Sequence, residues 1–175
     1  MKLLFTHSYF YKLDAKQWRF KQPYPPLGTI LAASVLRTSG HEVVFFDTNL
    51  RDSPDEIVPL LTKEKPECVI IYDDGFNYLT KMCLTNMREA AFKMIKLAKE
   101  KNCTIIVSSS DSTDHYEQYL QEGADFIILG EAEQTLSELT AAIDQQQNNF
   151  LSIPGLAYKQ NDAVIKTVKR NVLKE

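Results

Sequence analysis

The sequence of 175 residues has no long hydrophobic run and no excess of basic charge. No apolar stretch approaches the roughly 20 residues that a membrane-spanning helix needs, and the first residues, MKLLFTHSYFY, are too polar and aromatic for a secretion signal. The net charge of −3 gives no long-range attraction to nucleic acid or anionic lipid. The basic and aromatic cluster KQWRFK at residues 16–21 is isolated, so a solvated or partner-facing loop is its favoured interpretation. We therefore expect a cytoplasmic protein with neither a membrane nor a nucleic acid as partner.

Cysteines and catalytic signatures are equally scarce. The three cysteines, Cys68, Cys83 and Cys103, are too far apart for paired metal ligands, and an odd number without a secretion signal fits reduced, buried thiols better than disulfides. The sequence has no phosphate-binding loop, no Gly-x-Gly-x-x-Gly, no nucleophile elbow and no zinc spacing. We therefore expect a chain that is not catalytic on its own, and we assign it no catalytic or metal-ligating residue.

What the sequence does contain is an alternation of short apolar runs with amphipathic stretches. The runs at residues 2–6, 42–47, 68–72, 103–107 and 125–129 have strand length, and a helical pattern follows each of them. This alternation predicts an α/β protein of the flavodoxin-like (Rossmann-like) class, with a five-stranded parallel sheet covered by helices on both faces.

The predicted domain occupies residues 1–150, and the pattern changes after it. Two short apolar runs at residues 156–159 and 164–167 indicate a β-hairpin, which we interpret as an appendage or linker over residues 151–175.

The predicted helix ends depend on local signals. A helix that begins at Leu27 after Pro25-Pro26 should stop before Gly40, and a capping box at residues 53–56 should open a helix that Pro59 keeps short. A helix from about Asp114 should have Ser112 or Thr113 as its N-cap. The last helix should open at Gly130.

The predicted fold also places the ligand site. In an open parallel sheet, ligands bind outside the carboxyl ends of the strands, near the point where the strand order reverses. This rule selects the five loops at residues 6–28, 47–53, 73–77, 108–113 and 130–135.

Each loop also allows an interpretation without a ligand. His7 could be an axial metal ligand or an acid/base, or it could simply be hydrogen-bonded. Asp73 and Asp74 could bind a metal or share a proton, yet a turn before Gly75 is the favoured interpretation. Acidic residues near the start of the last helix suit the helix dipole by themselves.

Three segments resemble a known family. PPLGTILAASVLRTSGHEVVFFD at residues 25–47, DFIILGEAEQTLSEL at 125–139 and IPGLAYK at 153–159 are similar, in order and spacing, to the N-terminal cobalamin-binding domain of cobalamin-dependent radical SAM enzymes. The resemblance implies a domain that holds a corrin over the carboxyl ends of the strands, for methyl transfer or a related radical reaction.

The resemblance also implies a partner. A radical SAM domain, in cis or in trans, would carry the iron-sulfur cluster and S-adenosylmethionine. The sequence has no Cys-x-x-x-Cys-x-x-Cys triplet for such a cluster, so we expect both cofactors in a separate, following domain and only cobalamin here.

Individual positions follow from the resemblance. The family's Gly-Glu-Gly-Glu-x-Thr is matched from Gly130 to Thr135, with Ala132 in place of the second glycine, whereas Ser108 and Ser109 replace its Gly-Gly. The histidine motif Asp-x-His-x-x-Gly of other cobalamin domains is absent, which implies binding without a protein imidazole ligand. The predicted cofactor-binding residues are Thr6, His7, Pro26, Gly28, Asp73, Asp74, Gly75, Ser108, Ser109, Ser110, Gly130, Glu131 and Glu133.

Two alternatives stay open at this point. The two serines could mark a degenerate, cofactor-free member of the family that serves as a scaffold or recognition module. The fold could also bind another small ligand such as a nucleotide. A phosphorylation receiver shares the fold but needs acidic residues after the first strand, where this chain has Thr6-His7-Ser8.

Overall fold

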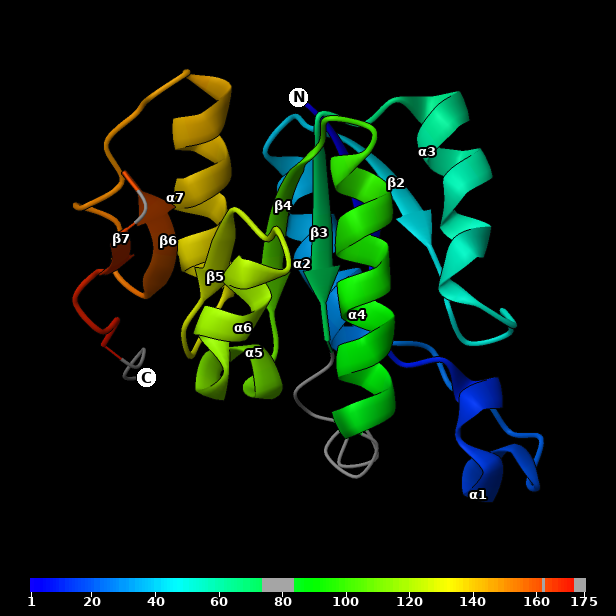
Figure 1. The fold of residues 1–175 in the computed structure, drawn as a ribbon. Helices are drawn as coiled ribbons and strands as arrows, with labels where there is room; N and C mark the ends of the chain where they lie inside the picture. The colour runs from blue at the N-terminus through cyan, green and yellow to red at the C-terminus, as the bar shows by residue number, and fades with distance from the viewer. Residues whose placement is uncertain (74–83, 162, 172–175) are drawn as a thin grey trace.

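A computed structural model describes residues 1–73, 84–161 and 163–171, and it contains one mixed β-sheet (Figure 1). The strand order is β2-β1-β3-β4-β5-β6-β7. The first five strands are parallel and have the flavodoxin-like order 2-1-3-4-5, which confirms the predicted fold class. These strands are β1 (Lys2–Thr6), β2 (Glu42–Phe46), β3 (Cys68–Tyr72), β4 (Thr104–Ser108) and β5 (Phe126–Ile128).

The C-terminal hairpin is confirmed, but it belongs to the same sheet. β6 (Leu156–Gln160) pairs antiparallel with β5, and β7 (Ala163–Lys166) pairs antiparallel with β6. The sheet therefore has seven strands rather than the five predicted. The reason is physical: β5 would otherwise expose its outer edge, and the apolar start of β6 is fully buried against it.

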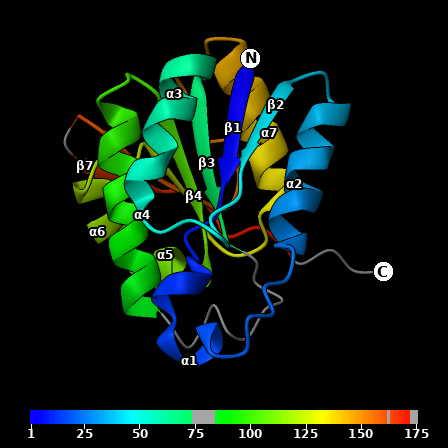
Figure 2. The same ribbon diagram turned by 90° about the vertical axis from the view of Figure 1, so that its right-hand side faces the viewer.

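Helices cover both faces of the sheet (Figures 1 and 2). α2 (Leu27–Thr38) and α7 (Glu133–Asp144) lie on one face, and α3 (Val58–Glu64), α4 (Leu84–Lys99), α5 (Ser110–Asp114) and α6 (Tyr116–Gln121) lie on the other. Short turns complete the chain, namely η1 (Tyr11–Leu13), α1 (Ala15–Trp18) and η2 (Pro54–Ile57). None of the helices in the described residues is long and apolar enough to cross a membrane.

The two faces explain the continuous apolar runs. Along β3, Val69 and Ile71 pack with the α4 side, whereas Cys68 and Ile70 pack with the α2 and α7 side. Side chains of successive strand residues point to opposite faces, so every position meets a helix layer. Cys68 and Cys103 are buried free thiols, as expected, and burial raises the pKa of Cys68; Cys83 lies outside the described residues.

The predicted helix ends are correct in part. The capping box at Ser53 is present, and the helix that follows it is short. The helix expected from Asp114 begins earlier, because Ser109 rather than Ser112 or Thr113 is the N-cap of α5. α7 begins at Glu133 rather than at Gly130, since Gly130 has the left-handed φ of +84°.

The link between α7 and the hairpin is tight. The Arg170 side chain donates from Nε to Thr135 Oγ1 at 2.6 Å and also pairs with Glu138 on α7. A Cβ at Gly155, where β6 begins, would lie 3.2 Å from Leu129 O and 3.2 Å from Thr135 Oγ1. A side chain at Gly155 would therefore be crowded by the backbone of Leu129 and by Thr135.

We predict that Gly155→Ala destabilises the whole domain more than Gly40→Ala. Both glycines have positive φ, +78° and +94°, but nothing lies within 4 Å of a Cβ at Gly40. Gly40→Ala should cost about 1 kcal/mol of backbone strain, and Gly155→Ala a further ~1–3 kcal/mol of steric conflict. Urea unfolding followed by circular dichroism measures both; equal losses would contradict the tight packing at Gly155.

Candidate functional site

The strand order reverses at β1, so the crevice for a ligand lies at the carboxyl ends of β1 and β3. Figure 2 shows that the connection after β1, with α1, lies beyond this edge of the sheet. This edge, which we call the carboxyl edge, carries Thr6 to Ser8, Asp47 to Asn49, Tyr72 and Asp73, Ser108 and Ser109, and Leu129 to Glu131.

His7 is hydrogen-bonded rather than available. Its side chain is only 3% exposed. Nε2 lies 3.0 Å from Asp47 Oδ1 and Nδ1 lies 3.0 Å from Thr48 Oγ1, so both ring nitrogens are occupied. Burial of Asp47 opposes its ionisation, but the hydrogen bonds from His7 and from the Asn49 backbone outweigh burial and lower the Asp47 pKa. His7 therefore ties β1 to the end of β2 in this structure.

Asp73 connects three strand ends. Its Oδ1 accepts from Ser8 N at 2.7 Å, its Oδ2 accepts from Ser8 Oγ at 2.8 Å, and its own N donates to Ser108 O at 2.9 Å. Burial raises the pKa of Asp73, and the hydrogen bonds from Ser8 act against that rise. Among the described residues no cluster of His, Cys, Asp and Glu could hold a metal ion. Asp74 and Gly75 lie outside the described residues.

Ser108, the last residue of β4, and Ser109, which follows it, differ in role. Ser108 is 6% exposed and lies beside Tyr72 and Ile128 in register, on the side of α2 and α7. Its hydroxyl has no hydrogen-bond partner in the part of the chain that the structure describes. By contrast, Ser109 Oγ accepts from Ser112 N at 2.8 Å, and Ser112 Oγ accepts from Ser109 N at 2.9 Å. The Ser109 hydroxyl therefore caps α5, whereas the Ser108 hydroxyl is not hydrogen-bonded to any described residue.

Asp111 anchors the turn from Ser109 to Ser112, which we call the serine turn. It is 6% exposed, and its Oδ2 accepts from Arg88 Nε on α4 at 2.8 Å and from Tyr119 OH on α6 at 2.8 Å. Burial opposes ionisation of Asp111, but Arg88 and Tyr119 outweigh it and lower its pKa. This role of Asp111 could not be predicted from the sequence, because Arg88 lies 23 positions away and no local spacing joins the two residues.

The predicted residues of α2 and α7 meet around Tyr72. Thr29 Oγ1, next to the buried Gly28, donates to Tyr72 O at 2.7 Å, and Tyr72 OH donates to Glu133 Oε1 at 3.0 Å. Thus Thr29, Ser108 and Glu133 all neighbour Tyr72, through its carbonyl, its register position and its hydroxyl respectively. Pro26 is buried at the N-cap of α2.

The remaining predicted residues are more scattered. Thr6 is fully buried and its Oγ1 lies 4.0 Å from Met94 Sδ on α4, on the opposite face from Ser108. Ser110, Gly130 and Glu131 are exposed at the edge, and a Cβ at Gly130 would meet nothing within 4 Å. Whether any of the predicted residues binds a cofactor stays a prediction.

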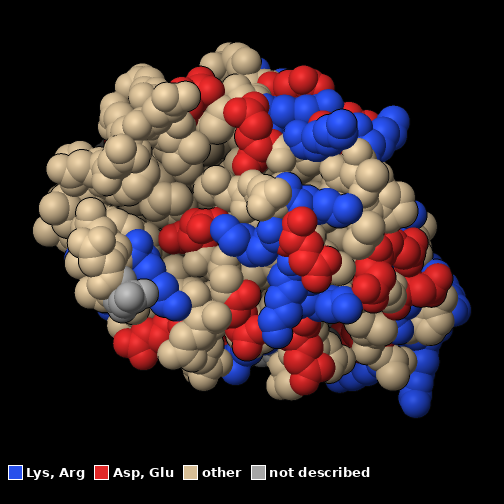
Figure 3. Space-filling view, turned by 45° about the horizontal axis from the view of Figure 1, so that its top comes forward, with Lys and Arg blue, Asp and Glu red and all other residues tan. Residues whose placement is uncertain are grey.

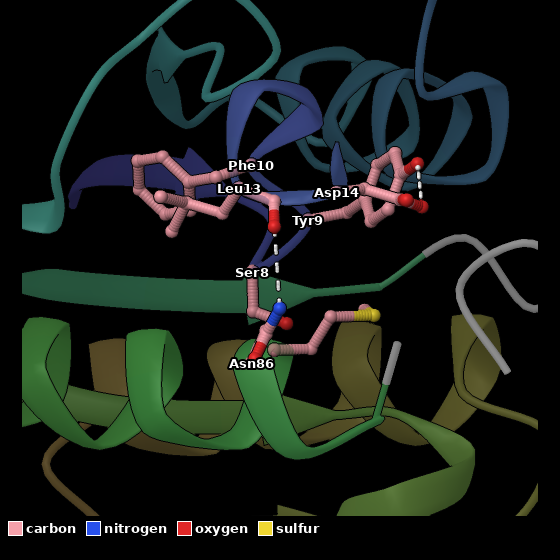
Figure 4. A pocket seen from close by; sticks show the side chains of 7 residues that line it. Ser8, Tyr9, Phe10, Leu13, Asp14 and Asn86 are labelled. Carbon is pink, nitrogen blue, oxygen red and sulfur yellow. Dashed lines mark hydrogen bonds between the residues drawn. The ribbon is translucent and has the colours of Figure 1, made fainter. Parts of the chain in front are cut away.

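The connection after β1 is held against α4 (Figure 4). Asn86 Nδ2 donates to Leu13 O at 3.3 Å, and Tyr9 OH donates to Asp14 Oδ2 at 3.0 Å. The cavity between them is about 10 Å³, which suits one water molecule and no cofactor. Its lining residues are Ser8, Tyr9, Phe10, Leu13, Asp14, Asn86 and Met87.

The strand order and the helices on both faces of the sheet define a flavodoxin-like α/β domain. Residues 19–140 match the family model described as B12 binding domain, which is more than half of the chain. The chain therefore belongs to the B12-binding domain family.

Individual relatives are longer proteins. The chain is 24% identical over 160 residues to the anaerobic magnesium-protoporphyrin IX monomethyl ester cyclase of Synechocystis, with 89% of this chain covered. It is 27% identical over 175 residues to the cyclase of Rubrivivax gelatinosus, with 94% covered. The chain spans 30% and 29% of these two relatives.

Solved structures agree on the fold. The radical S-adenosylmethionine methyltransferase TsrM of Kitasatospora setae, with cobalamin and a [4Fe-4S] cluster bound, superposes with a TM-score of 0.75 at 15% identity over 99% of this chain and 30% of its own. The cobalamin-dependent S-adenosylmethionine radical enzyme OxsB, with aqua-cobalamin and S-adenosylmethionine bound, gives 0.70 at 17% identity over 98% of this chain and 22% of its own.

The anchor at Asp111 gives a prediction with a defined pH dependence. Asp111→Asn should lower the free energy of unfolding by about 1–3 kcal/mol at pH 7, because a buried, charge-assisted pair is lost. The pKa of Asp111 is lowered in the folded state, so its contribution is present above the ordinary pKa and is lost as pH falls through the folded pKa.

Urea unfolding at pH 7 and at about pH 3, below the ordinary aspartate pKa, measures this difference. The gap between wild type and Asp111→Asn should narrow at the lower pH. Asp114→Asn is the matched control on α5, since Asp114 is exposed, and it should change stability by less than about 0.5 kcal/mol at either pH. A gap of equal size at both pH values would argue against the ion pair.

Proposed function

We propose that this chain is a cobalamin-binding domain that holds the corrin over its carboxyl edge for a radical SAM domain, in cis or in trans. The observation that carries the proposal is the family match over residues 19–140, which includes the ends of β2, β3, β4 and β5. In a flavodoxin-like sheet this edge is where ligands bind.

The residues at the edge fit such a cofactor. Ser108 offers a nearly buried hydroxyl without a partner among the described residues, and Gly130 leaves open space at the end of β5. Gly28 is buried at the start of α2, next to Thr29, which bonds the Tyr72 carbonyl. Neither ring nitrogen of His7 is free to bind cobalt, because Nε2 is paired with Asp47 and Nδ1 with Thr48. Binding without a protein imidazole therefore agrees with these contacts.

The remaining polar contacts would hold the edge in place. Asp73 joins β1, β3 and β4, and Asp111 fixes the serine turn between α4 and α6. A site whose supporting groups are locked by hydrogen bonds orients a ligand more accurately than loose loops do. When bound, cobalamin would supply the cobalt chemistry of methyl transfer or a related radical reaction.

The radical SAM partner is supported by the solved structures of the same fold. TsrM and OxsB are both described as radical S-adenosylmethionine enzymes with cobalamin, and the chain spans 30% and 22% of them. In this proposal the iron-sulfur cluster and S-adenosylmethionine belong to the partner domain.

A second candidate is a cofactor-free scaffold of the same family. The observation that favours it is the replacement of Gly-Gly by Ser108 and Ser109, which adds bulk at the edge. Since Ser109 caps α5, its replacement already has a structural explanation, and Ser108 is the position that distinguishes the two functions.

We predict that the purified protein takes up hydroxocobalamin and retains corrin absorbance after gel filtration. The expected stoichiometry is one corrin per chain, measured from the visible spectrum and the protein concentration. His7→Gln should leave the visible spectrum of the bound corrin unchanged, because His7 is not an axial ligand in this proposal. A colourless protein after gel filtration would refute the proposed function.

Ser108 and Ser109 allow a matched test of the cofactor's nucleotide tail. If the Ser108 hydroxyl bonds that tail, Ser108→Gly should weaken cobalamin binding about 3- to 10-fold, as expected for one hydrogen bond. Binding of cobinamide, which lacks the tail, should not change. Ser109→Gly should alter neither affinity and should cost only a few tenths of a kcal/mol of stability.

The opposite result has a clear meaning. If wild type binds no cobalamin and Ser108→Gly binds it, the serine blocks the site and the scaffold function is the better account. Titrations followed by tryptophan fluorescence and by the visible spectrum separate these cases.

A further inference from the structure

Helix α2 turns small residues toward the sheet and large apolar residues outward. Its buried residues include Gly28, Ala32 and Ala33. Four large side chains on its other side are each between 41% and 57% exposed, namely Leu27, Ile30, Leu31 and Val35. Their spacing places them in one stripe along the helix. A stripe of large apolar side chains in water indicates a surface that another protein covers.

The strand beside this helix is the free edge of the sheet. Figure 2 looks onto that edge, where β2 lies next to α2. In the described chain β2 pairs only with β1, and its sequence EVVFF has no proline or lysine to hinder further pairing. Glu42 N donates to Met1 O, on the β1 side. Since successive strand residues direct their backbone groups to alternate sides, Val43 and Phe45 direct theirs outward.

A groove joins the helix stripe to the strand edge. It has a volume of about 230 Å³, and its lining residues are Ile30, Ala33, Ser34, Arg37, Val43 and Phe45. Ile30 belongs to the stripe, and Val43 and Phe45 belong to the free edge, so the three features form one continuous surface. We call it the α2/β2 surface.

The side of the molecule that carries α3 to α6 is different. Charges of both signs crowd it (Figure 3), and they pair with one another, as in Lys93 with Asp55 at 3.2 Å and Lys96 with Glu122 at 2.6 Å. Paired surface charges stay well hydrated and need no partner. The apolar contact surface is therefore the one on α2 and β2.

A second copy of the chain matches the α2/β2 surface by symmetry. A two-fold axis perpendicular to the sheet at Val44 makes two β2 strands antiparallel and places Val43 opposite Phe45 of the second copy. These residues direct their backbone groups outward, so each such pair can exchange two hydrogen bonds. The same axis keeps both α2 helices on one face of the joined sheet, where their apolar stripes meet antiparallel.

Charges on the other face complement each other in the same register. Glu42 comes opposite Phe46 of the second copy, and within each chain the Arg51 guanidinium lies over the Phe46 ring, with Cζ 5.2 Å from its centre. The Glu42 side chain bonds Lys2 Nζ at 3.0 Å but is still 67% exposed, so it can also meet Arg51 of the second copy. Opposite charges across an antiparallel pair are stabilising, and the axis produces this contact twice.

We propose that the chain forms a two-fold symmetric dimer through the α2/β2 surface, with the two sheets joined across β2. The dimer does not depend on the proposed cobalamin binding. The strands of the two copies run in opposite directions, so the two carboxyl edges lie at opposite ends of the joined sheet and stay open. The apolar stripe is only ~12 Å long, which places the contact at the small end of specific interfaces, and we expect a Kd of about 10–100 µM.

The test is sedimentation equilibrium of the full chain from about 5 to 500 µM, a range that brackets this Kd. Wild type should change from monomer to dimer. Leu31→Lys should raise the Kd at least about tenfold, because it places like charges in the middle of the helix contact. Leu151→Lys is the matched control: Leu151 is 57% exposed but lies before β6, outside the surface, so the Kd should not change. Circular dichroism checks that both variants are folded.

The register has its own test. Glu42→Lys and Arg51→Glu should each weaken the dimer about three- to tenfold, and the double variant should regain most of the affinity because opposite charges face each other again. With oxidised glutathione as the oxidant, Val44→Cys should give a disulfide-linked dimer that wild type does not give, because the axis passes between the two copies of residue 44.

Three results would overturn the proposal. The first is a wild type that stays monomeric at the highest concentration, which would leave the α2/β2 surface to another domain of a longer protein. The second is a Leu31→Lys variant that dimerises as tightly as wild type. The third is a double charge variant that dimerises no better than either single variant.

Discussion

Burial of both faces of the parallel sheet is the constraint on which the rest of the structure depends. Helices α2 and α7 cover one face and α3 to α6 cover the other, so strand residues such as Ile70 and Ile71 are fully buried whichever way they point. Polar chemistry is therefore left to the ends of the strands. At the carboxyl edge the Asp73 carboxylate accepts from Ser8 and the Asp73 backbone N donates to Ser108 O, so the ends of β1, β3 and β4 are hydrogen-bonded to one another.

The sequence pattern was sufficient for the parallel strands, because a run as short as CVIIY, bounded by Pro66 and by Asp73, is typical of a strand that is buried on both faces. The same pattern predicted the hairpin but not its place in the sheet. LAYKQ has the same local pattern whether it forms a free appendage or continues the sheet, and pairing with the three residues of β5 depends on contacts across the fold. Long-range pairing of this kind leaves no trace in local spacing.

The candidate site, too, could be predicted from the sequence only in part. Gly28, Ser108 and Glu133 could be placed at one edge from the sequence, since the fold brings strand ends together. The difference between Ser108 and Ser109 could not, because it depends on which hydroxyl returns to the helix start. Likewise, Asp111 looked like part of a polar loop, and only the folded chain brings Arg88 and Tyr119 to it. Side-chain direction, rather than residue type, separates the hydroxyl that is paired within the fold from the one that is not.

The contact between Arg170 and α7 joins two distant parts of the chain. The guanidinium group bonds Thr135 and Glu138, both within the first two turns of α7, and Glu133 at the start of that helix bonds the Tyr72 hydroxyl. Tyr72 in turn pairs in register with Ser108 on β4. One short helix thus links the segment that leaves the hairpin to the strand ends at the carboxyl edge.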